Sequence, residues 1–483
     1  MCRSLVAVTE VHSRSTGVAQ VRHILLVEPN FRNKYPPLGL MKISTYHQRR
    51  GDHVVFVKGC DDGASTQQWD RIYVSSLFTF YWDITIRTIR FYAQSVLSPR
   101  DMWVGGVMAT LMGDEIAALT GASVVRGLLN QPGQLDRDSR VIVDELTPDY
   151  SMLDTIEYQY GLGDAYLGYA TRGCPNRCDF CAVQQIEPTF IGYLPLKRQL
   201  KSLEMLFGER HNLVLMDNSV LASESLDRIV GDLLDLGYER GAKLNGRQRR
   251  VDFNQGTDVR LLTPDRMKLL AMTALRPLRL AFDDSRLRPI YEAGVRLAAE
   301  HEVRHLSNYI LFNYRDTPED FYERLRLNPV LNQELGTQIY SFPMKFVPLN
   351  AKDRSYVGKH WSPRLLRGVQ CILVATRGMV GTHLDFFEAA FGHDGKEFLE
   401  IALMPEDYIV HRHAHAANGA EDWRRDFRAL SAGERSEFLD VAAAKKITQR
   451  DVSAASTGRL KRLLSHYVDE RSSDQGQLSL LDG

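Results

Sequence analysis

The sequence predicts an α/β protein with an N-terminal doubly wound domain, an incomplete (β/α)6 barrel and a C-terminal helical region. Strand-like and helix-like runs alternate over residues 21–130, five or six strand–helix units follow within 166–349, and helical spacing dominates from 350 onward. Strands that alternate with helices of ten or more residues indicate parallel sheets. At 483 residues, the chain is long enough for two or three domains.

The N-terminal domain, residues 21–130, begins with the strand "VRHILLVEPN" and the helix "PPLGLMKISTYHQRRG". Four further strands are expected in "HVVFVKG", "RIYVSSL", "DMWVGGV" and "ASVVRG". In such a doubly wound sheet, ligands bind beyond the carboxyl ends of the strands. Residues 1–20 are expected to be a flexible N-terminus. Residues 131–165 mix turn formers with isolated apolar residues, and we expect an ordered linker packed across both domains.

The expected barrel, residues 166–349, repeats a strand followed by a helix. "NLVLMDN" leads into "ASESLDRIVGDLLDLG", and "RVDFNQGTDVRLLTPDRMKLLAM" repeats the scheme with Thr263 as N-cap and Pro264 in the first turn. "LRLAFDD" and "LSNYILFNYRDTPEDFYERL" supply the next strands, and Thr317 and Pro318 open another helix. "QIYSFPMKFVPL" ends the series. In parallel barrels the functional residues lie at the carboxyl ends of the strands.

The remaining chain is expected to form a helical domain over 350–440 and a C-terminal helix with a disordered tail over 441–483. "WSPRLLRGVQCILVATRG", "DFFEAAFG" and "GKEFLEIALM" carry the helical spacing. This region could supply the substrate pocket.

The charge balance argues against a protein that binds polyanions over its whole surface. Lys plus Arg and Asp plus Glu both number 60, so there is no strong overall field, although a local basic groove remains possible. The basic run "ERGAKLNGRQRR", residues 239–250, could contact a phosphate backbone, but we expect a solvated loop before the strand at Val251. No signal-like or membrane-spanning apolar stretch is present, which predicts a cytoplasmic protein.

The stretch "TRGCPNRCDFCAV" holds Cys174, Cys178 and Cys181, half of the six cysteines in the chain. In a reducing compartment, such a cluster indicates metal or redox chemistry rather than a disulfide. A structural zinc site normally needs a fourth Cys or His, often in a second CxxC pair, and the sequence has no such pair. Three thiolates on a four-iron cluster would leave one iron free to bind a small molecule. We therefore favour a cluster over zinc.

This motif resembles that of the radical S-adenosylmethionine (radical SAM) enzymes, CxxxCxΦC, with Phe180 as the aromatic residue. The resemblance implies a 4Fe-4S cluster held by the three cysteines, with S-adenosyl-L-methionine on the free iron. It also implies reductive cleavage to a 5′-deoxyadenosyl radical, which abstracts hydrogen from an unidentified substrate. The expected electron donor is flavodoxin-like or ferredoxin-like. No side chain needs to act as a general base, so no catalytic residue is assigned.

The same resemblance suggests contacts to S-adenosylmethionine at the ends of the strands. Asp217 and Asn218 stand where the family binds the methionyl amino group, with "MDN" in place of the usual "GGE". Gln255, Asp258 and Arg260, in "NQGTDVR", fall where ribose and carboxylate contacts are expected. The guanidinium of Arg260 suits planar two-point pairing with a carboxylate. Asn313 lies where a Gly-rich adenine-binding strand is usual.

The N-terminal domain resembles the cobalamin-binding domain that precedes many radical SAM barrels, including the phrases "YPPLGL" and "VGG". Of the family's DxHxxG, SxL and GG motifs, Ser75 with Leu77 and Gly105 with Gly106 match the last two. Asn30 stands in place of the cobalt-binding His, and an amide is a poor cobalt ligand. Cobalamin could bind without a protein lower ligand, the cofactor could have been lost, or the domain could serve the substrate.

These features leave several functions open. The main expectation is hydrogen abstraction, and the first alternative is a cobalamin-dependent radical SAM methyltransferase. A methylthiotransferase is disfavoured because only Cys2 and Cys60 precede the motif, whereas that group has three more cysteines.

An alternative of another class is a noncatalytic iron–sulfur scaffold or sensor that docks through its tail. Gln477 to Leu481, "QLSLL", resembles the peptide by which bacterial DNA-metabolism proteins bind the sliding clamp. Clamp binding would suggest that the substrate is a nucleic acid or a nucleotide.

Overall fold

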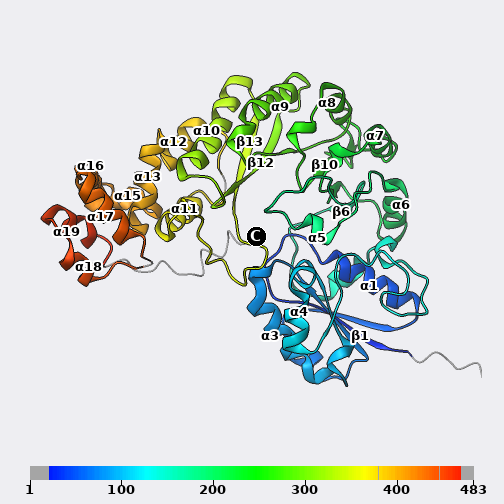
Figure 1. The fold of residues 1–483 in the computed structure, drawn as a ribbon. Helices are drawn as coiled ribbons and strands as arrows, with labels where there is room; N and C mark the ends of the chain where they lie inside the picture. Colours follow the sequence, from blue (N-terminus) through cyan, green and yellow to red (C-terminus); the bar gives the residue numbers. More distant parts are fainter. Residues whose placement is uncertain (1–20, 379, 445, 469–483) are drawn as a thin grey trace, which may run out of the picture.

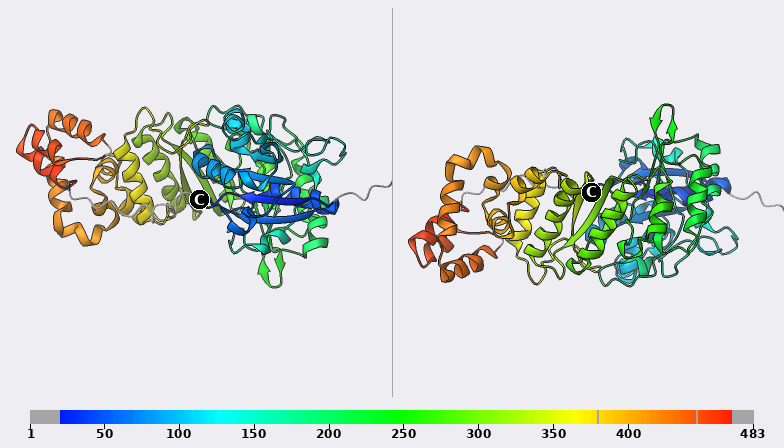
Figure 2. Two further views of the ribbon diagram at one scale, coloured as in Figure 1. Left: turned by 90° about the horizontal axis from the view of Figure 1, so that it is seen from below. Right: turned by 90° about the horizontal axis from the view of Figure 1, so that it is seen from above.

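The computed structural model describes residues 21–378, 380–444 and 446–468. Two α/β regions lie side by side at one end of an elongated molecule, and a helical region extends away from them (Figures 1 and 2). Cys2, the expected flexible segment 1–20 and the clamp-like peptide Gln477 to Leu481 lie outside the described residues. No helix in the described ranges is both long enough and apolar enough to cross a membrane.

The N-terminal domain is a five-stranded parallel sheet with the strand order β2-β1-β3-β4-β5. Its elements are β1 (His23–Glu28), α1 (Leu38–Arg49), β2 (His53–Lys58), α2 (Asp62–Ser65), β3 (Arg71–Ser76), η1 (Thr79–Tyr81), α3 (Trp82–Phe91), β4 (Met102–Gly106), α4 (Val107–Thr120) and β5 (Ser123–Val124). Successive side chains of β1 point to opposite faces. Ile24 and Leu26 pack with α1, whereas Leu25 and Val27 pack with α3 and α4. The predicted doubly wound domain is confirmed.

The strand order reverses between β1 and β3, which are neighbours in the sheet. Chain connections leave these two strands in opposite directions, so the loops beyond their carboxyl ends part and form a crevice. The "EPN" turn after β1 and the "SxL" motif at the end of β3 both lie there.

The second region, which we call the central region, contains six parallel strands. Its elements are β6 (Ala165–Gly168), α5 (Val183–Ile186), α6 (Leu196–Phe207), β7 (Asn212–Leu215), α7 (Leu226–Asp235), β10 (Arg250–Phe253), α8 (Pro264–Ala271), β11 (Leu278–Ala281), α9 (Arg288–Glu300), β12 (His305–Phe312), α10 (Pro318–Leu335) and β13 (Gln338–Lys345). As predicted, Thr263 and Thr317 cap α8 and α10, and a proline occupies the first turn of each helix.

The six strands follow the order expected of an incomplete barrel, but they form two three-stranded sheets, β10-β7-β6 and β11-β12-β13. Among the described residues, backbone pairing between the two sheets is limited to the isolated parallel bridges Val251–Leu275 and Thr257–Leu280. Pro277 directly precedes β11 and has no N–H to donate to a ladder. The predicted single barrel sheet is therefore interrupted between β10 and β11.

The N-terminal domain packs directly against the central region. Tyr35 and Leu38, from the "YPPLGL" segment, contact the small apolar cluster of Ala165, Leu167 and Val214 on β6 and β7. The Tyr35 hydroxyl also donates a 2.5 Å hydrogen bond to Asn254 Oδ1, just beyond β10. This segment therefore connects the N-terminal domain to the β10-β7-β6 sheet of the central region.

The helical region follows β13. Its helices are α11 (Pro363–Ala375), α12 (Leu384–Phe391), α13 (Gly395–Leu403), α14 (Glu406–Val410), α15 (Arg412–His415), α16 (Glu421–Arg428), α17 (Ala432–Ala442), α18 (Gln449–Ala454) and α19 (Gly458–Ser465). Their core is continuous with the last strand–helix unit of the central region, because Phe321, Tyr322 and Leu325 of α10 belong to the same cluster as Trp423 and Phe438.

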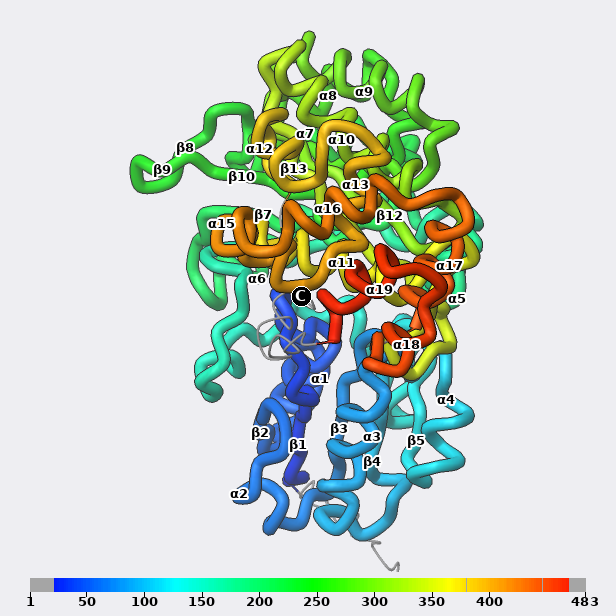
Figure 3. The backbone as a smooth tube through the Cα atoms, turned by 90° about the vertical axis from the view of Figure 1, so that its left-hand side faces the viewer, coloured from blue at the N-terminus to red at the C-terminus, as the bar shows by residue number. Residues whose placement is uncertain are grey.

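The basic run 239–250 is not the expected loop. It contains the short antiparallel strands β8 (Lys243–Leu244) and β9 (Arg247–Gln248). Asn245 and Gly246 join them with φ angles of 50° and 78°, the left-handed pair that a tight hairpin turn requires. This Asn-Gly signal was present in the sequence. The hairpin stands out from the body of the molecule (Figures 2 and 3).

Candidate functional site

The loop that carries the three cysteines, residues 171–181, lies over the carboxyl ends of the central strands. Asn176 Nδ2 donates a 2.9 Å hydrogen bond to Asp258 Oδ2, beyond the end of β10. The ring of Phe180 meets that of Tyr314, beyond β12, edge to face at 5.8 Å between centroids. The loop therefore spans from its own strand, β6, to the ends of β10 and β12.

Cys174, Cys178 and Cys181 are free, half-exposed thiols. Burial raises the pKa of Cys178, and the Cys181 and Cys174 thiols raise it further. Burial likewise raises the pKa of Cys181, although a backbone hydrogen bond from Val183 opposes the shift. In the described part of the chain no three His, Cys, Asp or Glu side chains converge to hold a single metal ion. The thiols thus do not close around one point.

Buried polar groups fix the backbone of this loop from behind. Glu187, which follows α5, accepts hydrogen bonds from the Gly173 N–H at 2.7 Å, from Arg172 at 2.6 Å and from Asn218 Nδ2 at 3.0 Å. Gln184 donates to the carbonyl oxygen of Cys174 and, at 2.9 Å, to that of Asn176. The thiols are therefore held on a rigid backbone while remaining accessible.

A chain of alternating charges connects this loop to the N-terminal domain. Lys42 of α1 pairs with Asp144 of the linker at 2.8 Å, Asp144 pairs with Arg172 at 2.7 Å, and Arg172 pairs with Glu187. Burial alone would raise the pKa of Asp144, but Lys42 and Arg172 lower it below its usual range. These residues come from four separate segments, so no local sequence pattern could have revealed the chain.

Asp217, a predicted contact of the methionyl amino group, is fully buried behind the cysteine loop. Its carboxylate accepts hydrogen bonds from Ala170 N at 3.0 Å and from Thr171 Oγ1 at 2.6 Å, and also from Thr171 N. Burial raises its pKa to about 6 in spite of these hydrogen bonds. In this structure Asp217 fixes the segment that leads into the cysteines, and Asn218 contacts Glu187.

Asp258 and Arg260 lie beside the cysteine loop, as the sequence suggested, but they pair with each other. Two hydrogen bonds of 2.8 and 2.6 Å join the Arg260 guanidinium to both oxygens of Asp258. Asp258 raises the pKa of Arg260, and the Cys178 and Cys174 thiols add to the shift, which puts the guanidinium within electrostatic reach of the sulfurs. Gln255 is exposed nearby, with Nε2 4.0 Å from Met216 Sδ.

Asn313 is fully buried, with a φ of 67°. Its side chain donates to the carbonyl oxygens of Phe346 and Tyr356 at 3.1 and 3.2 Å and accepts from Gly358 N at 2.7 Å. It therefore joins the end of β12 to the segment after β13. A direct contact from Asn313 or Asp217 to S-adenosylmethionine stays a prediction.

In the N-terminal domain, the "SxL" and "GG" motifs lie side by side at the ends of β3 and β4, where Ser75 pairs with Gly105 in the sheet register. Ser75 Oγ is buried and has no hydrogen-bond partner in the described part of the chain. Gly106 has a φ of 104°, and a Cβ there would lie 2.1 Å from the Ser76 carbonyl oxygen. Leu77 accepts a hydrogen bond from Met108 N at 2.9 Å. Only glycine fits at 106, and Ser75 offers an unsatisfied polar atom.

Much of the rest of this crevice is filled by the chain itself. Glu28 binds Lys58 at 2.7 Å and accepts from Asn33 Nδ2 at 2.8 Å, and Tyr160 donates to Glu28 as well. Asn30 is exposed, and a Cβ at Gly59 would lie 3.1 Å from Asn30 Cβ. That Asn30 stands in place of a cobalt ligand stays a prediction.

The interior of the central region holds a polar cluster that the sequence gave no reason to single out. Arg279 of β11 pairs with Asp252 of β10 through two hydrogen bonds of 2.7 and 2.8 Å, and it contacts Ser307 Oγ at 3.2 Å. Tyr309 donates to the Asn254 carbonyl oxygen at 3.0 Å. Side chains alternate between the two faces of a strand, and the inward-facing positions of β10, β11 and β12 therefore include charged and polar residues as well as apolar ones.

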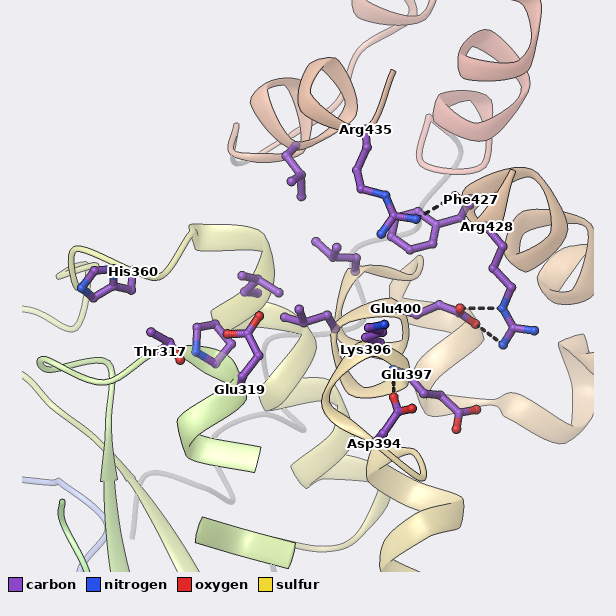
Figure 4. A pocket seen from close by; sticks show the side chains of 15 residues that line it. Thr317, Glu319, His360, Asp394, Lys396, Glu397, Glu400, Phe427, Arg428 and Arg435 are labelled. Carbon is purple, nitrogen blue, oxygen red and sulfur yellow. Dashed lines mark hydrogen bonds and ion pairs between the residues drawn. The ribbon is translucent and has the colours of Figure 1, made fainter. Parts of the chain in front are cut away.

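A cavity of about 850 Å³ lies in the helical region, between the start of α10 and helices α11, α13, α16 and α17 (Figure 4). Leu365, Leu399 and Leu403 form part of its lining, and Glu400 and Arg428 form an ion pair of 2.7 Å in its wall. No residue of the cysteine loop lines this cavity.

No protein-family model matches the sequence, and no curated protein matches it. The solved structures to which the chain is similar include two of the radical S-adenosylmethionine methyltransferase TsrM from Kitasatospora setae. One has cobalamin and a 4Fe-4S cluster bound, with 16% identity and a TM-score of 0.48, and covers 68% of this chain and 77% of that chain. The other has tryptophan substrate and the SAM analogue aza-SAM bound. It is 16% identical with a TM-score of 0.49, and the match covers 72% of this chain and 76% of that chain.

Proposed function

We propose that the chain is a radical SAM enzyme that cleaves S-adenosylmethionine reductively and abstracts hydrogen from its substrate. The observation that carries this proposal is the position of Cys174, Cys178 and Cys181. They are three accessible thiols on one rigid loop over the carboxyl ends of parallel strands. This is the end of an α/β region at which chemistry takes place.

The donor set of the loop fits a 4Fe-4S cluster, because three thiolates can bind three of its four irons. When bound, such a cluster supplies the electron that cleaves the sulfonium C–S bond. The protein's own task is to hold the thiols, orient S-adenosylmethionine and exclude water. Glu187 and Gln184 hold the loop backbone, so they are positioning residues.

Asp258, Arg260 and Gln255 are the proposed contacts to S-adenosylmethionine, because they flank the cysteine loop on its open side. Arg260 can turn its guanidinium from Asp258 to the carboxylate of the bound molecule, since both partners offer two oxygens in a plane. Asn218 lies beside Glu187 and could contact the same molecule only after leaving that partner.

A cobalamin-dependent methyltransferase is the second candidate. One feature of the N-terminal crevice favours it: the buried Ser75 Oγ, which has no hydrogen-bond partner among the described residues. This hydroxyl would suit a large polar group that approaches the ends of β3 and β4. Asn30 provides no imidazole, so the corrin would bind without a protein lower ligand.

The test is anaerobic reconstitution with iron and sulfide, followed by reduction with dithionite or a flavodoxin and measurement of 5′-deoxyadenosine. We expect the wild-type protein to form 5′-deoxyadenosine and Cys178→Ala to form none. Cys60→Ala changes an exposed cysteine outside the motif and serves as the matched control, with full activity expected. A folded protein that binds a cluster but cleaves no S-adenosylmethionine under any reductant would support the noncatalytic scaffold instead.

The same preparation separates the two enzymatic candidates. Equilibrium dialysis with hydroxocobalamin tests whether a corrinoid is retained in stoichiometric amount, which would place methyl transfer first. Incubation with deuterium-labelled candidate substrates, followed by mass analysis of 5′-deoxyadenosine, identifies the hydrogen donor, because only a true substrate transfers its label.

A further inference from the structure

Two arginines and a histidine gather at the amino ends of strands β10, β11 and β12, opposite the cysteine loop. Arg250 is the first residue of β10, Arg276 lies two positions before β11, and His305 is the first residue of β12. Parallel strands begin at a common edge, and Arg276 N donates to the Val251 carbonyl oxygen, so these side chains are neighbours.

These cations have no acidic partner among the described residues. Arg250 and Arg276 form no ion pair or hydrogen bond through their side chains there, and Arg304 donates only to backbone carbonyls, at 3.0 Å for Leu335. Two carboxylates of this region already bind other cations, since Glu302 pairs with Arg240 and Glu209 pairs with Arg249.

The cations also perturb one another. Burial lowers the pKa of Arg276, and Arg250 lowers it further. Burial lowers the pKa of His305, and both arginines add to that shift, so its imidazole is neutral at pH 7. The positive charge at this edge therefore comes from the arginines, which would stabilise an anion.

The same residues surround a hollow of about 220 Å³. Arg276, Arg304, His305 and Gln248 line it, together with Arg240 and its ion-pair partner Glu302, whereas Arg250 lies outside the lining. Because it is concave, polar and large enough for a phosphate group, it offers several donors to one anion rather than a single exposed charge.

The projecting hairpin extends this surface. Gln248 of β9 lines the hollow, Lys243 of β8 pairs with Gln248 in the antiparallel register, and Arg247 lies one pair nearer the turn. Arg247 has only a loose, exposed contact with Asp164, at 3.5 Å, and such surface pairs are weak. We define the basic face as the set Lys243, Arg247, Arg250, Arg276, Arg304 and His305.

We propose that the basic face binds the phosphate backbone of a nucleic acid. A row of separated cations fits a ligand with repeated phosphates, with one phosphate in the hollow and its neighbours along the hairpin. The chain as a whole has no net charge, so this attraction is local to the basic face. The proposal is independent of the iron–sulfur chemistry, because the basic face lies at the other end of the strands.

The test is fluorescence anisotropy of the full-length protein with labelled single-stranded RNA and DNA of about 20 nucleotides. Arg250→Glu/Arg276→Glu should weaken binding at least tenfold, and Lys243→Glu/Arg247→Glu should weaken it to a smaller extent. Each lost phosphate contact should reduce the slope of log affinity against log salt by about 0.7. Arg90→Glu, on an exposed arginine of α3 in the N-terminal domain, is the matched control and should retain wild-type affinity.

Circular dichroism and thermal unfolding establish that each variant is folded, and Arg250→Lys/Arg276→Lys should keep most of the affinity. The proposal is overturned if wild-type protein binds neither oligonucleotide, or if Arg90→Glu loses as much affinity as the double variants. It is also overturned if inorganic phosphate binds at the basic face while oligonucleotides do not. Because none of these variants touches the cysteine loop, S-adenosylmethionine cleavage should be unchanged in all of them.

Discussion

The cysteine loop and the crevice of the N-terminal domain both lie at the carboxyl ends of parallel strands, yet their polar groups are arranged in opposite ways. Around the cysteines, buried carboxylates such as Glu187 and Asp217 bind the backbone, and the thiols remain accessible. In the crevice, Glu28 and Lys58 bind each other, and Ser75 Oγ is left without a partner.

This difference distinguishes a site that is ready for an external group from one that largely satisfies itself. Free donors on a fixed backbone make binding favourable, because little ordering is needed when the group arrives. A crevice filled by its own ion pair offers fewer open donors. Because the thiols are accessible and the crevice is largely filled, we propose iron–sulfur chemistry first and cobalamin chemistry second.

The largest effect is expected for Glu187→Ala, which removes the carboxylate that binds both Arg172 and the Gly173 N–H. Breaking a buried ion pair leaves an uncompensated charge, so the free energy of unfolding should fall by about 3–5 kcal/mol. The loop should also lose iron during gel filtration. Chemical denaturation and iron analysis measure the two effects.

Glu302→Ala is the control for this variant, because Glu302 forms an exposed ion pair with Arg240 and should contribute little. Equal free energies of unfolding for the two variants would show that the buried hydrogen bonds of Glu187 do not stabilise the cysteine loop.

The second prediction concerns Asp217, whose pKa rises from 3.8 to about 6 on folding. Between these values the folded chain binds more protons than the unfolded chain, so this group's contribution to stability falls as pH rises. Relative to Asp217→Asn, which does not titrate, the wild-type protein should lose about 3 kcal/mol of unfolding free energy between about pH 4 and pH 7. Urea denaturation across this range measures the difference. Parallel pH profiles of the two proteins would contradict it.

The third prediction tests the crevice. Asn30→His supplies an imidazole at the position where the resemblance places a cobalt ligand, and imidazole coordinates cobalt far better than an amide does. If the crevice accepts a corrin, hydroxocobalamin should bind on the order of tenfold tighter, about 1.4 kcal/mol, with a shifted visible spectrum. Arg32→His, two residues away in the same loop, should have no such effect. Identical affinities and spectra for Asn30→His and wild type would mean that a side chain at position 30 does not reach cobalt.

The smallest effect is expected where the two regions meet. Tyr35→Phe removes the hydrogen bond to the buried Asn254 and should lower the free energy of unfolding by about 1 kcal/mol. Tyr356→Phe is the control, because the hydroxyl of Tyr356 has no hydrogen-bond partner in the described residues. Tyr35→Phe should therefore unfold at a lower temperature than Tyr356→Phe. Equal unfolding temperatures would show that the Tyr35 hydrogen bond does not stabilise the contact between the N-terminal domain and the central region.

Much of the fold could be predicted because its signals are local. The caps Thr263 and Thr317 and the short apolar strands lie within a few residues of the elements that they define. The cysteine motif was equally visible, since its spacing is fixed within one loop. The hairpin within 239–250 was not predicted. Its Asn245-Gly246 pair is a hairpin-turn signal, but the residues on either side are mostly charged and lack the apolar alternation of a strand.

The remaining features depend on residues that are distant in the sequence. Lys42, Asp144, Arg172 and Glu187 meet only after three regions have packed, so no spacing rule connects them. The break between β10 and β11 depends on which strand Pro277 happens to face. For the same reason, the sequence could not show that Asp217 would bind the loop backbone.

The central claim is that three thiolates hold a cluster and leave one iron open. The most direct measurement is the electron paramagnetic resonance spectrum of the reduced, reconstituted protein before and after addition of S-adenosylmethionine. We predict a cluster signal whose g values shift when S-adenosylmethionine is added, because the molecule binds the open iron. A spectrum that is identical with and without S-adenosylmethionine would contradict the claim.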